Sequence, residues 1–355
     1  MRILMIGNVY PTQHQVCAVW MQRIAEQIAV QGHNVELLVI RGRASSAWGR
    51  FLQYVVFYAR LALKRMSKYD CVYVHQPSHC FLPLLGRSLG RARLTTHLHG
   101  TDLLPPTLGV KGRLARMLTL HACRRADLVI VPSEYFARKL LSFISPERLH
   151  VYPSGGVDVS AFAPPLLDAP RAGSPLQVGC ACRLFPGKGV DTLLEAIALL
   201  PVPFCVNVVG DGPERLRLER RAAALRVDGC VKFLGALPGD SMPEYLRSLD
   251  VFVFPTRLIE SLGLAALEAM GCSVPVIGSR IGALPEYIEH GVNGFLFEPG
   301  NARELAEMLR AFSQINDTRR QAMRASARQT AMKYDTKACT CQLLSAFRHL
   351  LREAA

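Results

Sequence analysis

"VFVFPTRLIESLGLAALEAMG" (Val251–Gly271) places a strand, a loop and a helix in direct succession. Its opening VFVFP is apolar and rich in aromatic and β-branched residues, which is typical of a strand buried on both faces. The closing LGLAALEAMG has the spacing of a largely buried helix. A strand that leads directly into a helix predicts a sheet of parallel strands joined by crossover helices. Two acids, Glu260 and Glu268, interrupt this apolar stretch, and packing alone does not explain them.

The same alternation of strands and helices runs through the whole chain and forms two series of six strands. The expected strands are Arg2–Asn8, Asn34–Ile40, Cys71–His75, Leu94–Gly100, Leu128–Ser133 and Leu149–Gly155, then Leu176–Cys182, Phe204–Gly210, Val231–Gly235, Val251–Pro255, Pro275–Ser279 and Asn293–Phe297. Between the series lies Ala161–Pro175, whose proline and small residues are typical of a hinge linker. We therefore expect an α/β protein with two Rossmann-like, doubly wound domains, over 1–165 and 170–337, facing each other across a cleft that holds the ligand. A C-terminal helix at about 338–355 is expected to pack back on the first domain.

The composition favours a globular protein of the cytosol. The chain has 355 residues, of which 50% are hydrophobic and 20% charged. Two domains suit this length. The opening MRILMIGNVY is too short for a secretory signal, and no run of about eighteen apolar residues predicts a membrane span. The eleven cysteines lack the usual zinc spacing, which favours free thiols in a reducing compartment.

The net charge of +14 lies almost entirely in the first half. Residues 1–165 hold 20 Lys and Arg against 8 Asp and Glu, and the remainder holds 22 against 20. Such asymmetry indicates an anionic partner, either nucleic acid or an anionic membrane surface. The segment Gly49–Lys68 has helical spacing with one polar stripe and a broad apolar face. This pattern fits a helix lying in a membrane interface and equally a crossover helix buried against the sheet. Because no nucleic-acid motif accompanies the charge, we favour the membrane and predict no nucleic-acid partner.

The second half carries residues suited to a phosphorylated sugar. Gly263 would stand near a helix start, where free backbone N–H groups attract phosphate. Eight residues of helix span about 12 Å, comparable to the distance from ribose to sugar across a pyrophosphate. Glu260 and Glu268 could therefore accept hydroxyl hydrogen bonds at both ends, although the spacing alone fits two solvated acids as well. In ACRLFPGKG (Ala181–Gly189), Arg183 and Lys188 could neutralise a leaving diphosphate.

These motifs together resemble the retaining GT-B glycosyltransferases of family 4, also called group 1. In the second half the resemblance is carried by RLFPGKG, VVGDGPE, VKFLGALP, ESLGLAALEAM, PVIGS, ALPE and HGVNGFLFEPG. In the first half it is carried by GHNVELLVI, HGTDL, ADLVIVPSEY and YPSGGVDVSAFAP, so it covers nearly the whole chain. It implies transfer of a hexose from a nucleotide diphosphate sugar to a glycan or lipid-linked acceptor, with retention of configuration, in polysaccharide, lipopolysaccharide or glycolipid synthesis.

The resemblance also implies roles for the donor-binding residues. Arg183 and Lys188 match the pair that holds the diphosphate, Glu260 the acid on the transferred sugar, and Glu268 the acid on the ribose. Gly263 and Leu264 would offer backbone N–H groups to the phosphate or sugar. Phe233 and Leu234 would lie near the base.

On the acceptor side, His99 matches a histidine beside the transferring sugar, and Asp102 completes its HGTD motif. His97 and His99 alternate along TTHLHG and so share one face of a strand, where core histidines are the alternative interpretation. His75 is a weaker candidate for the same pocket.

Asn8 and Tyr10 stand where the resemblance places the acceptor. The loop Tyr10–Trp20 departs from the family pattern, because it lacks a glycine at about Cys17 or Ala18. A milder departure is Ala283, at a position where glycine is common.

We therefore expect a cytoplasmic hexosyltransferase, peripheral at the cytoplasmic face of a membrane. No Asp-x-Asp motif stands in a suitable place, so we expect neither a metal nor another cofactor. Two alternatives remain. One is a GT-B epimerase or phosphorylase, and the other is a non-catalytic binding protein that uses the basic N-terminal face.

Overall fold

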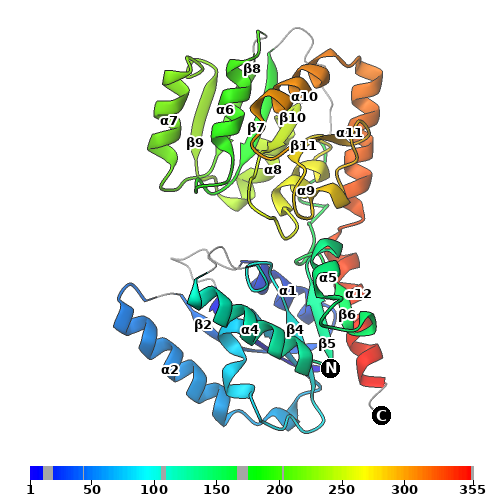
Figure 1. Cartoon of the computed structure of the whole chain (residues 1–355). Helices are drawn as coiled ribbons and strands as arrows, with labels where there is room; N and C mark the ends of the chain where they lie inside the picture. Colours follow the sequence, from blue (N-terminus) through cyan, green and yellow to red (C-terminus); the bar gives the residue numbers. More distant parts are fainter. Residues whose placement is uncertain (11–18, 43, 105–108, 166–174, 202–203, 353–355) are drawn as a thin grey trace. The chain divides into compact units, whose positions relative to one another are not determined.

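The computed structural model describes residues 1–10, 19–42, 44–104, 109–165, 175–201 and 204–352, with the side chains of 9, 10, 19 and 20 outside the description. It divides into two compact units, Met1–Gly156 with Thr336–Ala355, and Val157–Asp335. Each unit is built on a sheet of six parallel strands with helices on both faces (Figure 1). All twelve predicted strands are present, which confirms the prediction of two doubly wound α/β folds.

The sheet of the first unit has the strand order β2-β1-β3-β4-β5-β6. Its strands are β1 (Arg2–Tyr10), β2 (Asn34–Arg41), β3 (Cys71–His75), β4 (Arg93–His97), β5 (Leu128–Val131) and β6 (Leu149–Val151). The order reverses between β1 and β3. Ligands of doubly wound folds bind at such a switch point, beyond the carboxyl ends of the strands.

Successive side chains of these strands point to opposite faces and enter two separate cores. One face is covered by α2, α3, α4 and α5, and the other by α1 and α12. The C-terminal helix α12 thus belongs to the first unit, and its Phe347 ring lies 5.3 Å from that of Tyr73 on β3. The helices are α1 (Val19–Val30), α2 (Ala47–Leu63), α3 (Pro77–Cys80), α4 (Val110–Arg125), α5 (Glu134–Leu140) and α12 (Thr336–Arg352), with 3-10 turns at Met66–Lys68, Leu82–Leu84 and Pro146–Arg148.

Helix α2 has two different faces, so Gly49–Lys68 is neither simply a membrane-interface helix nor simply a buried crossover helix. Phe57 and Leu61 are buried in the core between α2 and the sheet. The opposite face is apolar and exposed, and it comprises Trp48, Phe51, Leu52, Val55, Val56 and Leu63. A crossover helix usually turns polar residues outward. The exposed face of α2 therefore needs an explanation other than packing on its own sheet.

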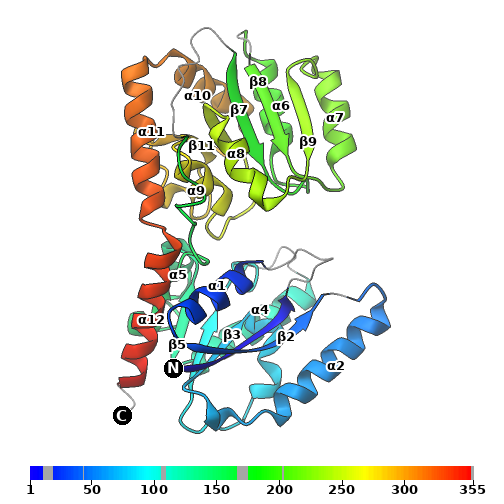
Figure 2. The same cartoon turned by 180° about the vertical axis from the view of Figure 1, so that it is seen from behind.

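The sheet of the second unit has the order β12-β11-β10-β7-β8-β9, with its switch point between β7 and β10. Its strands are β7 (Leu176–Ala181), β8 (Phe204–Val209), β9 (Val231–Gly235), β10 (Val251–Phe254), β11 (Val276–Ser279) and β12 (Gly294–Phe297). Helices α6, α7 and α10 pack on one face, and α8, α9 and α11 on the other (Figure 2). These helices are α6 (Val190–Ala198), α7 (Arg215–Ala224), α8 (Met242–Arg247), α9 (Leu264–Gly271), α10 (Ala302–Gln314) and α11 (Asp317–Met332), with 3-10 turns at Gly239–Ser241 and Leu284–Glu286.

The chain enters the second unit before the boundary expected at residue 165. Phe162 is buried in a core of the second unit. Arg328 on α11 donates hydrogen bonds to the carbonyls of Val159 and Phe162, at 2.9 and 2.8 Å. These contacts assign residues from Val157 onward to the second unit. Most of the proposed linker, 166–174, lies outside the described residues.

Two general features accompany this fold. Among the described residues, none of the helices is both long and apolar enough to cross a bilayer. The ten cysteines in the same part of the chain are all free thiols.

Candidate functional site

The loop after β7 contains the first predicted donor motif, and a glycine fixes where it runs. Gly189 has φ +77° and starts α6. A Cβ on Gly189 would stand 1.7 Å from the carbonyl oxygen of Pro255. Only glycine permits both this backbone conformation and this approach. The loop Arg183–Gly189 is therefore packed directly on the chain that leaves β10.

The loop after β10 is joined to the first loop along its length. The backbone N–H of Arg257 donates to the carbonyl of Gly187 at 2.7 Å. The side chain of Arg257 then reaches the Asp191 carboxylate on α6 at 3.0 Å. The loops that follow β7 and β10 thus lie together at the switch point of this sheet, where doubly wound folds bind ligands.

A cation and an acid from these two loops meet in direct contact. Lys188 Nζ donates to Glu260 Oε1 at 2.7 Å, and the side chains are only 20% and 16% exposed. The buried hydroxyl of Thr256 donates to the same oxygen at 3.1 Å. A Cβ on Gly282 would stand 2.5 Å from the backbone carbonyl oxygen of Glu260, so the loop after β11 supports this acid from behind. The Glu260 carboxylate is held in one place while its second oxygen is not engaged by these two donors.

Helix α9 begins beside this pair. Gly263, the N-cap residue directly before this helix, has φ +84°. The Tyr287 hydroxyl donates to the carbonyl of Leu262 at 2.9 Å and fixes the approach to the helix. The first backbone N–H groups of a helix, here from Leu264 onward, have no partner within it and favour an anion. Glu268 lies one turn further along α9, where it is half-buried.

The loops after β8 and β9 border the same edge of the sheet. The N–H of Gly210 donates to the carbonyl of Gly235 at 2.8 Å, and a Cβ on Gly210 would collide with the carbonyl oxygen of Cys182. On β9, Phe233 is half-buried and Leu234 is exposed. An apolar surface of this kind beside the donor loops suits a flat base.

The predicted donor residues therefore come from one edge of one sheet, and a direct contact joins two of them. Lys188 and Glu260 form a hydrogen-bonded ion pair. Arg183 is exposed, and its guanidinium lies 5.3 Å from the centre of the Phe185 ring. Thr256 and Gly282 were not predicted. A hydroxyl four residues before the acid and a glycine in IGALPE were the available signals.

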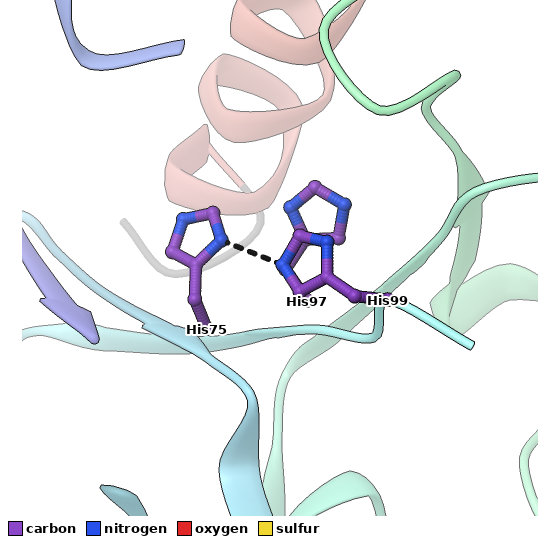
Figure 3. Close-up of side chains that lie close together, drawn as sticks. All are labelled: His75, His97 and His99. Carbon is purple, nitrogen blue, oxygen red and sulfur yellow. Dashed lines mark hydrogen bonds between the residues drawn. The ribbon is translucent and has the colours of Figure 1, made fainter. Parts of the chain in front are cut away.

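In the first unit, three histidines gather at the carboxyl ends of β3 and β4 (Figure 3). His75 and His97 are paired neighbours in the sheet, and His99 follows two residues later. His75 Nδ1 lies 3.1 Å from His99 Nε2, and His97 Nδ1 lies 2.7 Å from the Tyr73 hydroxyl. Gln76, with φ +48°, ends β3 directly after His75 because Pro77 cannot continue the ladder.

Burial keeps these imidazoles neutral. It lowers the pKa of His99 to about 3, and it lowers the pKa values of His75 and His97 well below the usual range. Asp102 is buried as well, which raises the pKa of its carboxyl to about 6. Its Oδ2 accepts a hydrogen bond from the backbone N–H of His99 at 2.8 Å.

The alternation in TTHLHG predicted that His97 and His99 share a side, and their rings lie 4.3 Å apart. His75 joins them through the pairing of β3 with β4, which sequence spacing alone does not contain.

The predicted acceptor side is described in part. The Asn8 amide donates to the Tyr54 hydroxyl on α2 at 3.1 Å, and Asn8 is buried. Tyr10 ends β1, and its side chain is outside the description. The positions of the missing glycine, Cys17 and Ala18, lie outside the described residues. Ala283 has an ordinary helical conformation, and Gly282 before it supplies the left-handed one, so glycine is not needed at 283.

Two family models match this chain and together span most of it. The model described as Glycosyl transferases group 1 matches residues 169–330, and the model described as Glycosyltransferase Family 4 matches residues 14–160. Their two ranges correspond to the second and the first unit.

Curated relatives carry related names. The GDP-mannose-dependent alpha-(1-6)-phosphatidylinositol monomannoside mannosyltransferase of Mycobacterium tuberculosis is 30% identical over 258 residues, covering 68% of this chain and 66% of that protein. The putative colanic acid biosynthesis glycosyltransferase WcaL of Escherichia coli is 29% identical over 247 residues, covering 65% and 58%. The match thus spans about half to two thirds of the relatives' own length.

Solved structures share the fold over nearly the whole chain. Sucrose-phosphate synthase of Thermosynechococcus elongatus superposes with a TM-score of 0.82 at 19% identity, covering 99% of both chains. Anabaena HepE in complex with UDP and glucose superposes with a TM-score of 0.76 at 23% identity, covering 97% of this chain and 98% of that one. At these identities the likeness shows the GT-B fold.

Proposed function

This chain belongs to glycosyltransferase family 4, and from that membership we propose that it transfers a hexose from a nucleotide diphosphate sugar to a glycan or lipid-linked acceptor. The observation that carries the proposal is the contact between Lys188 and Glu260. These residues lie 72 positions apart, come from different loops, and meet at the ligand-binding edge of the second sheet. A cation for phosphate beside an acid for sugar hydroxyls is the pair that such a donor requires.

The second unit is proposed to hold the donor along the edge formed by β7, β9, β10 and α9. Lys188 has three N–H donors and uses one on Glu260, so two remain for the diphosphate. Arg183, which is exposed, supplies the second cation and can bind phosphate through two parallel hydrogen bonds. Gly263 and Leu264 add backbone N–H groups, and Glu268 accepts from the ribose.

Loss of the diphosphate is the proposed chemical step. Negative charge develops on the leaving oxygen, and the two cations with the α9 N-terminus stabilise it. Glu260 holds a sugar hydroxyl with its second carboxylate oxygen. His99, kept neutral by burial, contacts the transferring sugar as an uncharged hydrogen-bond partner. Because these groups neutralise the leaving group, we propose that no metal is required. We propose retention of configuration from the resemblance to the retaining transferases of family 4.

The names of relatives support the choice of substrates. HepE has been solved with UDP and glucose, which supports a nucleoside diphosphate hexose as donor. Relatives named for colanic acid and for a phosphatidylinositol mannoside support an acceptor in polysaccharide or glycolipid synthesis.

The test is release of nucleoside diphosphate from a panel of nucleotide hexoses, with and without glycan and lipid-linked acceptors. We expect one donor to be turned over, and Lys188→Ala to lower its turnover by about 100-fold or more. Lys333→Ala, an exposed lysine at the end of α11, is the matched control and should keep full turnover. An epimerase would convert the donor without releasing nucleotide, a phosphorylase would need added phosphate, and a binding protein would turn over nothing. Each of these results contradicts the proposal.

We also propose that the first unit docks on an anionic membrane through α2 and α4. Phe51 and Val56 are 56% and 57% exposed although strongly apolar, and they lie on the face of α2 opposite its buried residues. Helix α4 covers the same side of the sheet and exposes Val110, Leu114 and Met117 among its cations. Neither helix contains an acidic residue. Apolar side chains interleaved with cations suit the boundary between anionic head groups and acyl chains. The chain would then work as a peripheral enzyme at the cytoplasmic face.

Co-sedimentation with vesicles tests this docking. We expect binding to vesicles that contain phosphatidylglycerol, weakening at high salt, and little binding to pure phosphatidylcholine. Phe51→Asp should weaken binding at least about tenfold through lost apolar burial and added negative charge. Val30→Asp, on the other side of the sheet at α1, should not. Equal binding by both variants would contradict the assignment of α2.

A further inference from the structure

The three histidines of the first unit lie close enough together for one nitrogen of each to bind the same metal ion. One nitrogen from each of His75, His97 and His99 lies within 4.8 Å of the other two. The ring centre of His75 lies 4.9 Å from that of His97 and 5.3 Å from that of His99, and the ring centres of His97 and His99 lie 4.3 Å apart. Three imidazoles around a tetrahedral zinc, each with a metal–nitrogen distance near 2.0 Å, have nitrogens about 3.4 Å apart and ring centres about 5 Å apart.

Hydrogen bonds engage Nδ1 of His97 and join the facing nitrogens of His75 and His99. His97 Nδ1 meets the Tyr73 hydroxyl, and among the described residues none hydrogen-bonds its buried Nε2. When His97 donates its Nδ1–H to Tyr73, the Nε2 lone pair is left for a ligand. Such a bond from the second ring nitrogen is the usual support of a metal-bound histidine.

The short contact between His75 Nδ1 and His99 Nε2, at 3.1 Å, is compatible with either a shared proton or a shared ion. If the proton moves to the other nitrogen of the same ring, both facing nitrogens offer lone pairs. No ring then gains or loses a net proton.

We propose that His75, His97 and His99 form a binding site for a Zn²⁺-type transition-metal ion, held by one nitrogen from each ring. Imidazole suits zinc, copper, nickel and cobalt, whereas Mg²⁺ and Ca²⁺ prefer oxygen ligands. Three protein ligands leave a fourth position open, and His99 is the partly exposed member of the cluster. The Asp102 carboxylate, bonded to the backbone N–H of His99, supplies a nearby negative charge.

Occupancy would have a consequence that rests on the proposed function. The His99 nitrogen that faces His75 would bind the ion and would no longer be available to the transferring sugar. Zinc would therefore inhibit transfer, and a chelator would restore it. Binding of the ion does not depend on this consequence and is measured separately.

Calorimetric titration of the untagged protein with Zn²⁺, and visible absorption with Co²⁺, test the site. We expect one ion per chain, a cobalt spectrum of tetrahedral nitrogen coordination, and no competition from Mg²⁺. His75→Ala should weaken zinc binding by about 100-fold or more, and Tyr73→Phe by about tenfold because it removes the support of His97. His121→Ala, an exposed histidine on α4 outside the cluster, is the matched control.

Absence of zinc binding by the native chain overturns the proposal, as does binding that survives His75→Ala. If His75→Ala fails to fold, Tyr73→Phe and the cobalt spectrum of the native chain still test the site. Unchanged zinc affinity in Tyr73→Phe, together with an octahedral cobalt spectrum, would show that the ion binds elsewhere. Zinc that binds without inhibiting transfer leaves the site intact and contradicts only the role proposed for His99.

Discussion

Gly189→Ala tests whether the loops after β7 and β10 form one unit. The new Cβ would stand 1.7 Å from the carbonyl oxygen of Pro255, and Cβ contacts under 3.0 Å essentially do not occur. The two loops would have to separate by about 1.3 Å to reach that limit. Forced separation in a packed region costs about 1–3 kcal/mol. The left-handed conformation at φ +77° adds about 1–2 kcal/mol for alanine.

We therefore expect Gly189→Ala to lower the free energy of unfolding of the second unit by about 2–5 kcal/mol, or about 10 °C in Tm. Both tryptophans, Trp20 and Trp48, belong to the first unit. Tryptophan fluorescence therefore reports the unfolding of the first unit, and far-ultraviolet circular dichroism reports both units.

Urea unfolding followed by both signals should show a shift in the circular dichroism transition of the second unit, with the fluorescence transition unchanged. Gly229→Ala is the matched control, since its Cβ meets no atom within 4 Å, and it should change stability by less than about 0.5 kcal/mol. If Gly189→Ala is as stable as Gly229→Ala, the two loops are not interlocked and do not form one unit at the site.

Three further predictions concern charge. Lys188→Ala should lower the free energy of unfolding of the second unit by about 1–2 kcal/mol, because it leaves the Glu260 carboxylate without its cation. Adding Glu260→Ala in the same chain should restore part of that free energy. If the effects of the two substitutions simply add in urea unfolding, the two residues are not coupled. The first unit should lose stability as the pH falls from about 6.5 towards 3, because His99 takes up a proton in the unfolded chain but not in the folded one. Asp102, whose pKa is raised by burial, acts in the opposite direction between about pH 4 and 6. A fluorescence-monitored stability that stays flat below pH 6.5 in both the native chain and His99→Asn would contradict the burial of His99. Glu268→Gln should weaken binding of nucleoside diphosphate about tenfold with the free energy of unfolding unchanged, and equal affinity would remove the ribose contact from the account.

Much of the fold could be predicted because each strand is short, apolar and bounded by turn residues. Segments such as VFVFP and CVYVH are buried on both faces, and their pattern leaves few alternatives to a parallel sheet. The strand order could not be predicted in the same way, since adjacency depends on packing between segments far apart in sequence. The crossing into the second unit at Val157 was placed too late for a similar reason, because Arg328 binds that segment from more than 160 residues away.

The candidate site shows the same division. Lys188 and Glu260 were named from their own motifs, and each motif has a local physical reason, a glycine-rich turn or a helix start. That they touch, and that Thr256 donates to the same oxygen, follows only from the packing of Gly189 on Pro255. For α2, the helical spacing was correct but did not distinguish between a core face and an exposed apolar face, because hydrophobic periodicity carries no information about what covers the residues.

The central claim is that the second unit binds the diphosphate of a nucleotide sugar with Arg183 and Lys188. It is tested most directly by calorimetric titration of the protein with a nucleoside diphosphate and with the matching monophosphate, in the native chain and in the double variant Arg183→Ala/Lys188→Ala. We predict that the diphosphate binds at least about tenfold more tightly than the monophosphate to the native chain, and that the double variant binds the two equally. A preference for the diphosphate that persists undiminished in the double variant would contradict the account.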